Sequence, residues 1–112
     1  MPYCLLFELY HIYLFVTYYL LVINVFSLED AVLVANELGI VFDKFSIKDF
    51  ITGLNIELEH GYANPITNVT NNDLIATAKI VLAHLMEFPN YYNDEYGLPA
   101  MEKELKKRLN ME

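Results

Sequence analysis

The most complete helix signals stand in residues 27–39, which read SLEDAVLVANELG. Ser27 followed by Asp30 resembles a capping box, in which side chain and backbone satisfy each other's hydrogen bonds in the first turn. Gly39 stands where a left-handed residue usually ends a helix. This stretch therefore predicts an amphipathic helix on a core. Its expected apolar face consists of Ala31, Leu33, Val34, Ala35 and Leu38.

Working outward, three more segments carry helix signals, so we expect an all-α fold. They are residues 46–61, residues 73 to about 88, and residues 99–109. Phe88 should be the last buried residue of the second of these segments, because Pro89 forbids simple continuation. Residues 27–112 should therefore form a small four-helix domain, and the 62–72 connection is long for so small a protein.

Residues 1–26 differ in composition from the rest and form an apolar N-terminal segment. They contain Glu8 and His11 but no Lys or Arg, and their length is about that of one membrane crossing. Three interpretations stay open: a single-pass membrane anchor, a buried helix or strand that covers the domain, or a non-native extension from a wrongly chosen start. The chain would be a membrane protein in the first case and cytoplasmic otherwise.

Charge and cysteine content exclude several classes of protein. The net charge of −8 and pI near 4.7 repel phosphate backbones, so we expect no nucleic-acid binding. The single cysteine, Cys4, excludes an internal disulfide and a cysteine-type zinc site. No phosphate-binding Gly-rich loop and no Ser-His-Asp set is apparent. The basic residues concentrate only near the C-terminus, at Lys103, Lys106, Lys107 and Arg108.

Two polar patterns interrupt the apolar helices, and each pairs a glutamate with a histidine three residues away. Glu57 precedes His60, and His84 precedes Glu87. Residues three apart share a helix face, which is the spacing of carboxylate-bridged metal sites in helical bundles. Helical projection places Glu57 beside the apolar stripe, leaning toward the core. These four residues are therefore candidate ligands of a divalent metal such as zinc, iron or manganese.

The alternative is that these side chains serve the fold alone. Glu57 and His60 would then pair with each other, and His84 would donate to a backbone carbonyl. A common site also has a geometric condition, because a plain antiparallel hairpin would separate His84 from His60 by about 16 Å along the axis. We expect a common site only if the 62–72 connection runs back and makes the helices roughly parallel.

Two stretches of the chain resemble the motifs of an uncharacterised-protein family found in bacteria and phages. They are ELEHG at residues 57–61 and KIVLAHLMEFPNYY at residues 79–92, and the resemblance covers about residues 27–103. It implies a compact helical domain without an assigned activity. The residues that it places in the family pattern are Glu57, Glu59, His60, His84, Glu87, Tyr91 and Tyr92.

The leading functional hypothesis is a non-enzymatic helical module, phage- or virus-associated, that binds a protein partner or forms a homo-oligomer. The alternative is a metal-binding domain with hydrolytic activity at Glu57, His60, His84 and Glu87. Tyr91, Tyr92 and Tyr96 are expected to close the rim of the core with their hydroxyls in water. The alternative is that they serve as proton donors or ligands.

Overall fold

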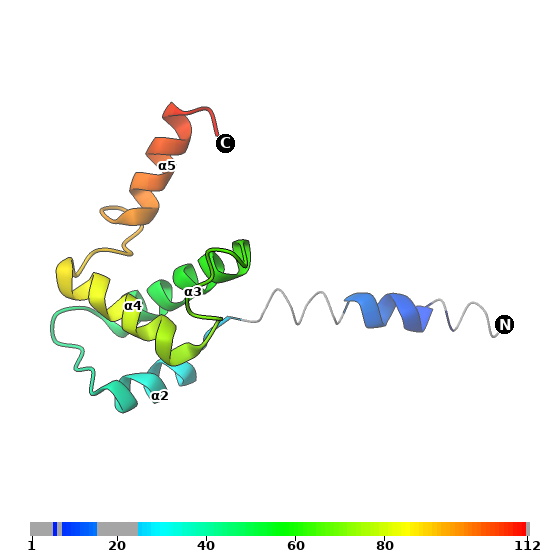
Figure 1. Ribbon diagram of the computed structural model, residues 1–112, viewed down its shortest axis with the longest axis horizontal. Helices are drawn as coiled ribbons and strands as arrows, with labels where there is room; N and C mark the ends of the chain where they lie inside the picture. The colour runs from blue at the N-terminus through cyan, green and yellow to red at the C-terminus, as the bar shows by residue number, and fades with distance from the viewer. Residues whose placement is uncertain (1–5, 7, 16–24, 112) are drawn as a thin grey trace.

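The structure is a computed structural model that describes residue 6, residues 8–15 and residues 25–111. Figure 1 shows α2 (Leu28–Leu38), α3 (Ile47–Ala63), α4 (Leu74–Glu87) and α5 (Leu98–Arg108). Residues 8–15 are also helical, and the described residues contain no strand. The prediction of an all-α fold is therefore confirmed for this part of the chain.

Helices α2, α3 and α4 begin where side chains cap them. The Ser27 hydroxyl accepts from the backbone N–H of Asp30 at 3.2 Å, and the Asp30 carboxylate accepts from the Ser27 N–H at 2.8 Å. Ser46 and Asp73 cap α3 and α4 in the same way, each through a backbone N–H three residues on. Gly39 ends α2 in the left-handed region, with φ at 68°. The predicted capping residues are thus in place.

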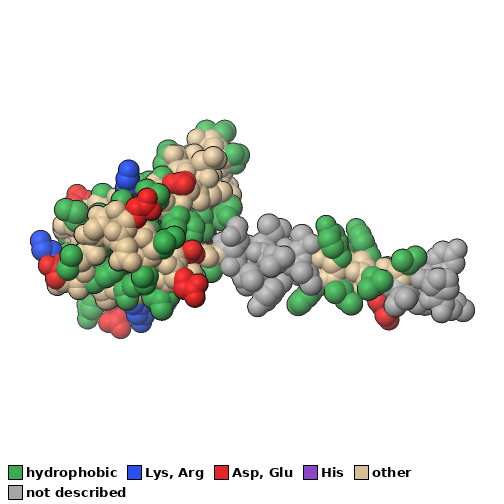
Figure 2. All heavy atoms as spheres, turned by 90° about the horizontal axis from the view of Figure 1, so that it is seen from below, with side chains coloured by type: hydrophobic (Ala, Val, Ile, Leu, Met, Phe, Trp, Pro, Cys, Tyr) green, Lys and Arg blue, Asp and Glu red, His purple; other side chains and the backbone are tan. Residues whose placement is uncertain are grey.

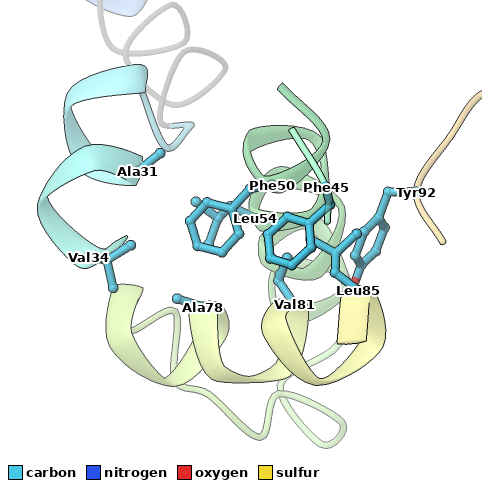
Figure 3. Packing of buried hydrophobic residues seen from close by; sticks show 9 residues of the cluster. All are labelled: Ala31, Val34, Phe45, Phe50, Leu54, Ala78, Val81, Leu85 and Tyr92. Carbon is cyan, nitrogen blue, oxygen red and sulfur yellow. The ribbon is translucent and has the colours of Figure 1, made fainter. Parts of the chain in front are cut away.

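The core lies among α2, α3 and α4, which pack against one another (Figure 3). α3 contributes its Phe50 and Leu54 side chains, and the turn after α4 contributes Tyr92. None of the core side chains is more than 9% exposed. The full cluster consists of Ala31, Val34, Phe45, Phe50, Leu54, Ala78, Val81, Leu85 and Tyr92.

Two residues predicted to be buried lie on the surface. Leu33 is 64% exposed, because it projects about 160° away from buried Ala31 around α2. Phe88 is 63% exposed. Its backbone is extended, with φ at −138°, so its side chain leaves the helical face that buries Leu85. An apolar side chain of these helices is therefore buried only where its direction around the helix points toward the core.

The fourth predicted helix exists, but the four helices do not pack together. α5 buries none of its residues and packs against none of α2, α3 and α4. The expected four-helix packing is thus wrong for the described residues, in which three helices share the core. Residues 88–97, which we call the 88–97 turn, connect this core to α5. In Figure 1 the helix projects away from the other three.

The N-terminal segment is described only in part. Residues 8–15 are all exposed, and Figure 2 shows their hydrophobic side chains on the surface. That exposure does not fit a buried covering segment. Among the described residues, no helix has the length and apolarity that a membrane crossing requires. The membrane-anchor interpretation rests largely on residues 1–5, 7 and 16–24, which lie outside the described part.

Candidate functional site

Glu57 is the centre of the candidate site. It lies on α3 between the buried residues Leu54 and Leu58, and its side chain is only 11% exposed. A carboxylate in such a place needs polar partners, because its burial without them costs about 2 kcal/mol or more. The prediction that Glu57 leans toward the core is confirmed, and Glu59, two residues on, is exposed.

Three side chains surround the Glu57 carboxylate. The Tyr92 hydroxyl donates to Oε1 of Glu57 at 2.7 Å. Nδ1 of His84 lies 2.7 Å from the Tyr92 oxygen and 3.3 Å from the same Oε1. Nδ1 of His60 lies 3.5 Å from Oε2, the other carboxylate oxygen. We call these four residues the Glu57 cluster.

Tyr92 joins the cluster to the core. It is 1% exposed, and its ring lies against Gly53 of α3. A Cβ on Gly53 would lie 2.6 Å from the Tyr92 ring and 2.6 Å from the Val81 side chain. The missing side chain of Gly53 therefore makes the space in which Tyr92 packs. Gly53 was not among the predicted site residues, although a small residue one position before buried Leu54 indicates a close approach.

Burial raises the pKa of Tyr92 well above its ordinary value, and the hydrogen bond to Glu57 and the charge of that carboxylate raise it further. The phenol therefore keeps its proton near neutral pH and acts as a donor. The expectation that the hydroxyl of Tyr92 lies in water was wrong, because the 88–97 turn carries the ring inward. The hydroxyl is instead part of the Glu57 cluster.

The proton count places a proton on Nδ1 of His84. A tyrosine hydroxyl has one proton, and the Tyr92 proton points to Glu57. Nδ1 of His84 then donates to the Tyr92 oxygen. Tyr91 stacks on the same ring, with centroids 4.3 Å apart and planes 9° apart. Hydrogen bonding and stacking thus both orient the imidazole.

Helices α3 and α4 bring His60 and His84 together without the parallel arrangement that was expected for a common site. Gly53 lies beside Val81, and Gly61 lies beside Asn72 just before α4. Contacts therefore run in opposite senses along the two helices, and the requirement for parallel helices was wrong. His60 and His84 reach the same carboxylate because Glu57 lies between them, one turn before His60.

The remaining predicted residues are placed as follows. Glu87 is exposed at the end of α4, and in the described part of the chain no hydrogen bond or ion pair joins it to the Glu57 cluster. Tyr96 is 80% exposed. Within residues 6, 8–15 and 25–111, no group of three or more His, Cys, Asp or Glu side chains is arranged to hold a metal ion.

A cavity of about 420 Å³ opens between the 88–97 turn and the start of α5. Tyr91 forms one wall of this cavity and stacks on His84 as well, so the cavity and the Glu57 cluster share a residue. Most of the lining is apolar or aromatic. It consists of Phe88, Pro89, Asn90, Tyr91, Tyr96, Gly97, Leu98 and Met101.

Within the described residues, every buried side-chain nitrogen and oxygen has a hydrogen-bond partner. The Glu57 cluster as it stands therefore anchors the 88–97 turn on α3 and α4. These features define a small helical domain with a partly buried tyrosine–carboxylate–histidine cluster. The chain belongs to a family of proteins of unknown function, DUF5661, whose model matches residues 31–104. No curated protein and no solved structure matches the chain.

Proposed function

We propose that this domain is a self-associating protein-interaction module, in which α5 pairs with a second copy of the chain. The observation that carries the proposal is the state of α5, which buries none of its residues. Met101, Leu105 and Leu109 are 56%, 50% and 65% exposed. A helix of about three turns has little stability in water without tertiary contacts, so its apolar side favours a partner.

Charge supports a second copy as that partner. α5 carries Lys103, Lys106, Lys107 and Arg108, which are four of the seven basic residues in a chain with a net charge of −8. Glu102 and Glu104 stand on the same helix, so the α5 of another copy offers carboxylates to these basic side chains. Complementary charges of this kind steer association and fix its orientation.

The Glu57 cluster has a supporting role in this proposal. It ties the 88–97 turn to α3 and α4 through Tyr92, and Leu98 at the start of α5 donates its backbone N–H to the Tyr91 carbonyl at 2.7 Å. The start of α5 is thereby held in place relative to the core. A helix that is fixed at one end loses less conformational freedom when it binds a partner.

The sedimentation behaviour of a Leu105→Glu variant tests self-association. The full chain is expected to form dimers at micromolar concentrations, and Leu105→Glu should raise the dissociation constant at least about tenfold, or 1.4 kcal/mol. The reason is that the variant puts a charge in the centre of the apolar stripe. Val41→Glu is the matched control, because Val41 is 70% exposed on the connector between α2 and α3. A monomeric wild-type chain would reject the proposal.

Metal binding is a second candidate function. The observation that favours it is that the imidazoles of His60 and His84 lie beside one carboxylate, with Nδ1 3.5 and 3.3 Å from its two oxygens. A bound ion would require a rearrangement, because Nδ1 of His84 carries the proton that it donates to Tyr92. Imidazole and carboxylate together suit zinc. The His60 side chain is 56% exposed and has room to turn toward a bound ion.

Thermal unfolding tests this second candidate. If zinc binds at the Glu57 cluster, an excess of about 100 times the dissociation constant should stabilise the chain by about 2.7 kcal/mol, and EDTA should reverse the effect. His60→Ala should abolish the response, whereas His11→Ala, outside the cluster, should retain it. A melting temperature unchanged by zinc, manganese and EDTA would end the metal-binding hypothesis.

A further inference from the structure

The apolar residues of α5 form one narrow stripe. Leu98, Met101, Leu105 and Leu109 fall within an arc of about 80° when the helix is projected at 100° per residue. All but Leu98 are at least half exposed. The stripe is nearly symmetric about Lys103, since Met101 and Leu105 lie two residues before and after it. A stripe of this kind meets its own reversed copy apolar residue to apolar residue.

Charged residues flank the stripe in a regular order. One flank carries Glu102 and Lys106, and the other carries Glu104 and Arg108. On each flank the acidic residue comes four positions before the basic one. Arg108 Nε lies 3.0 Å from Glu104 Oε1, so the two charges of that flank are neighbours in space.

The order of these charges distinguishes the two possible directions of pairing. In an antiparallel pair centred at the level of Lys103 the same flanks meet in reversed order. Glu102 of one copy then lies between Glu102 and Lys106 of the other, and Glu104 lies near Glu104, with Arg108 farther away. In a parallel pair the opposite flanks meet, so Glu102 approaches Glu104 and Lys106 approaches both Arg108 and Glu104, which gives about twice as many close like-charge contacts as the antiparallel pair. Flanking charges select orientation in helix pairs in this way, and like charges disfavour the wrong partner.

On the basis of the proposed function, we infer that two copies associate through antiparallel α5 helices about a two-fold axis at the level of Lys103 along the helix, and that each copy fills the cavity of the other. The contact is then isologous, because the same surface of both copies takes part. It closes after two copies and leaves no free α5 to recruit a third.

The cavity supports the same arrangement. It lies at the N-terminal end of α5 and is lined by Tyr96, Leu98 and Met101 among others. An antiparallel partner places its C-terminal end there. Leu109 and Met111 at that end are 65% and 64% exposed, and they are apolar side chains of the kind that the cavity wall favours. In this arrangement the C-terminal residues of one copy cover the apolar wall of the cavity of the other.

Cysteine cross-linking tests the direction of pairing. In a Cys4→Ser background, the full chain is prepared with Met101→Cys and, separately, with Leu105→Cys. An antiparallel pair places position 101 opposite position 105, within the distance of about 4–7 Å between Cα atoms that a disulfide needs. Oxidation of the mixed sample should therefore give the 101–105 product in excess over both 101–101 and 105–105, as read by mass spectrometry.

Sedimentation of the same samples separates the two ways of failing. Dimers that yield mainly 101–101 and 105–105 products, or no cross-link at all, would overturn the antiparallel inference and leave self-association standing. Monomers would overturn the proposed function together with the inference. For the cavity, Met111→Glu should raise the dissociation constant at least about tenfold, whereas Val69→Glu, on the 84% exposed Val69 of the α3–α4 connection, should not. An unchanged constant for Met111→Glu would overturn the filling of the cavity.

Discussion

Replacing Glu57 with leucine is expected to lower the free energy of unfolding by about 2 kcal/mol, and the same replacement of Glu59, two residues away, by less than about 0.5 kcal/mol. The two glutamates lie on one helix and share its backbone environment. Glu57 accepts the hydrogen bond of Tyr92 at 2.7 Å, whereas Glu59 is exposed. The difference between the two variants therefore isolates the contacts of the Glu57 carboxylate. Urea unfolding of both variants measures it.

The leucine variant should also change the tautomer of His84. Without Glu57 the Tyr92 hydroxyl has one polar neighbour left, which is Nδ1 of His84 at 2.7 Å. Tyr92 is then expected to donate to Nδ1, and the ring proton moves to Nε2. Nitrogen-15 chemical shifts of the imidazole distinguish the two tautomers. If Glu57→Leu is as stable as Glu59→Leu and leaves the tautomer unchanged, the cluster does not hold the 88–97 turn.

The helix starts were predictable because their causes are local. A capping residue and its partner lie three residues apart, so Ser27 with Asp30 can be identified without tertiary information. Burial was less predictable. Leu33 and Leu38 are both apolar residues of α2, and only the direction of each side chain around the helix separates the exposed one from the one at the core. To predict burial, the angular position of each apolar residue around the helix has to be worked out separately.

The candidate site was predictable only in its α3 and α4 members. The spacing of Glu57 and His60 and the projection of Glu57 toward the core follow from helix geometry. Tyr92 lies 35 residues from Glu57, and its inward direction depends on the 88–97 turn folding back over Gly53. No local pattern encodes that contact. The sequence analysis therefore placed the hydroxyl of Tyr92 in water.

The position of α5 was unpredictable for a different reason. Its spacing of apolar residues is the same whether the helix packs on its own core or on another chain. Only the structure shows that the core is closed by α2, α3 and α4 without it. The exposed apolar residues of α5 are thus the evidence for an interface.

Tyr92→Phe is expected to be less stable than the wild-type chain near neutral pH, by about 1–3 kcal/mol, because the phenol donates to a charged carboxylate. That difference should shrink at high pH. Burial, and then the hydrogen bond and charge of Glu57, raise the pKa of Tyr92 in the folded chain, whereas an unfolded tyrosine titrates near a pKa of about 10. Below that value both states hold the proton, and the stabilising contact is fully present.

Above about pH 10 the unfolded chain releases the Tyr92 proton and the folded chain keeps it. The free energy of unfolding of the wild-type chain therefore falls by about 1.4 kcal/mol for each further pH unit. Phenylalanine has no such proton, so the free energy of unfolding of Tyr92→Phe does not fall for this reason. Urea unfolding of both chains between about pH 8 and about pH 11 should therefore show two stabilities that are separate and parallel at first and then converge. Curves that stay parallel throughout would mean that the folded chain ionises Tyr92 as readily as the unfolded one, and the hydroxyl would then not be enclosed between Glu57 and His84. Because the other tyrosines are common to both chains, the convergence reports on Tyr92 alone.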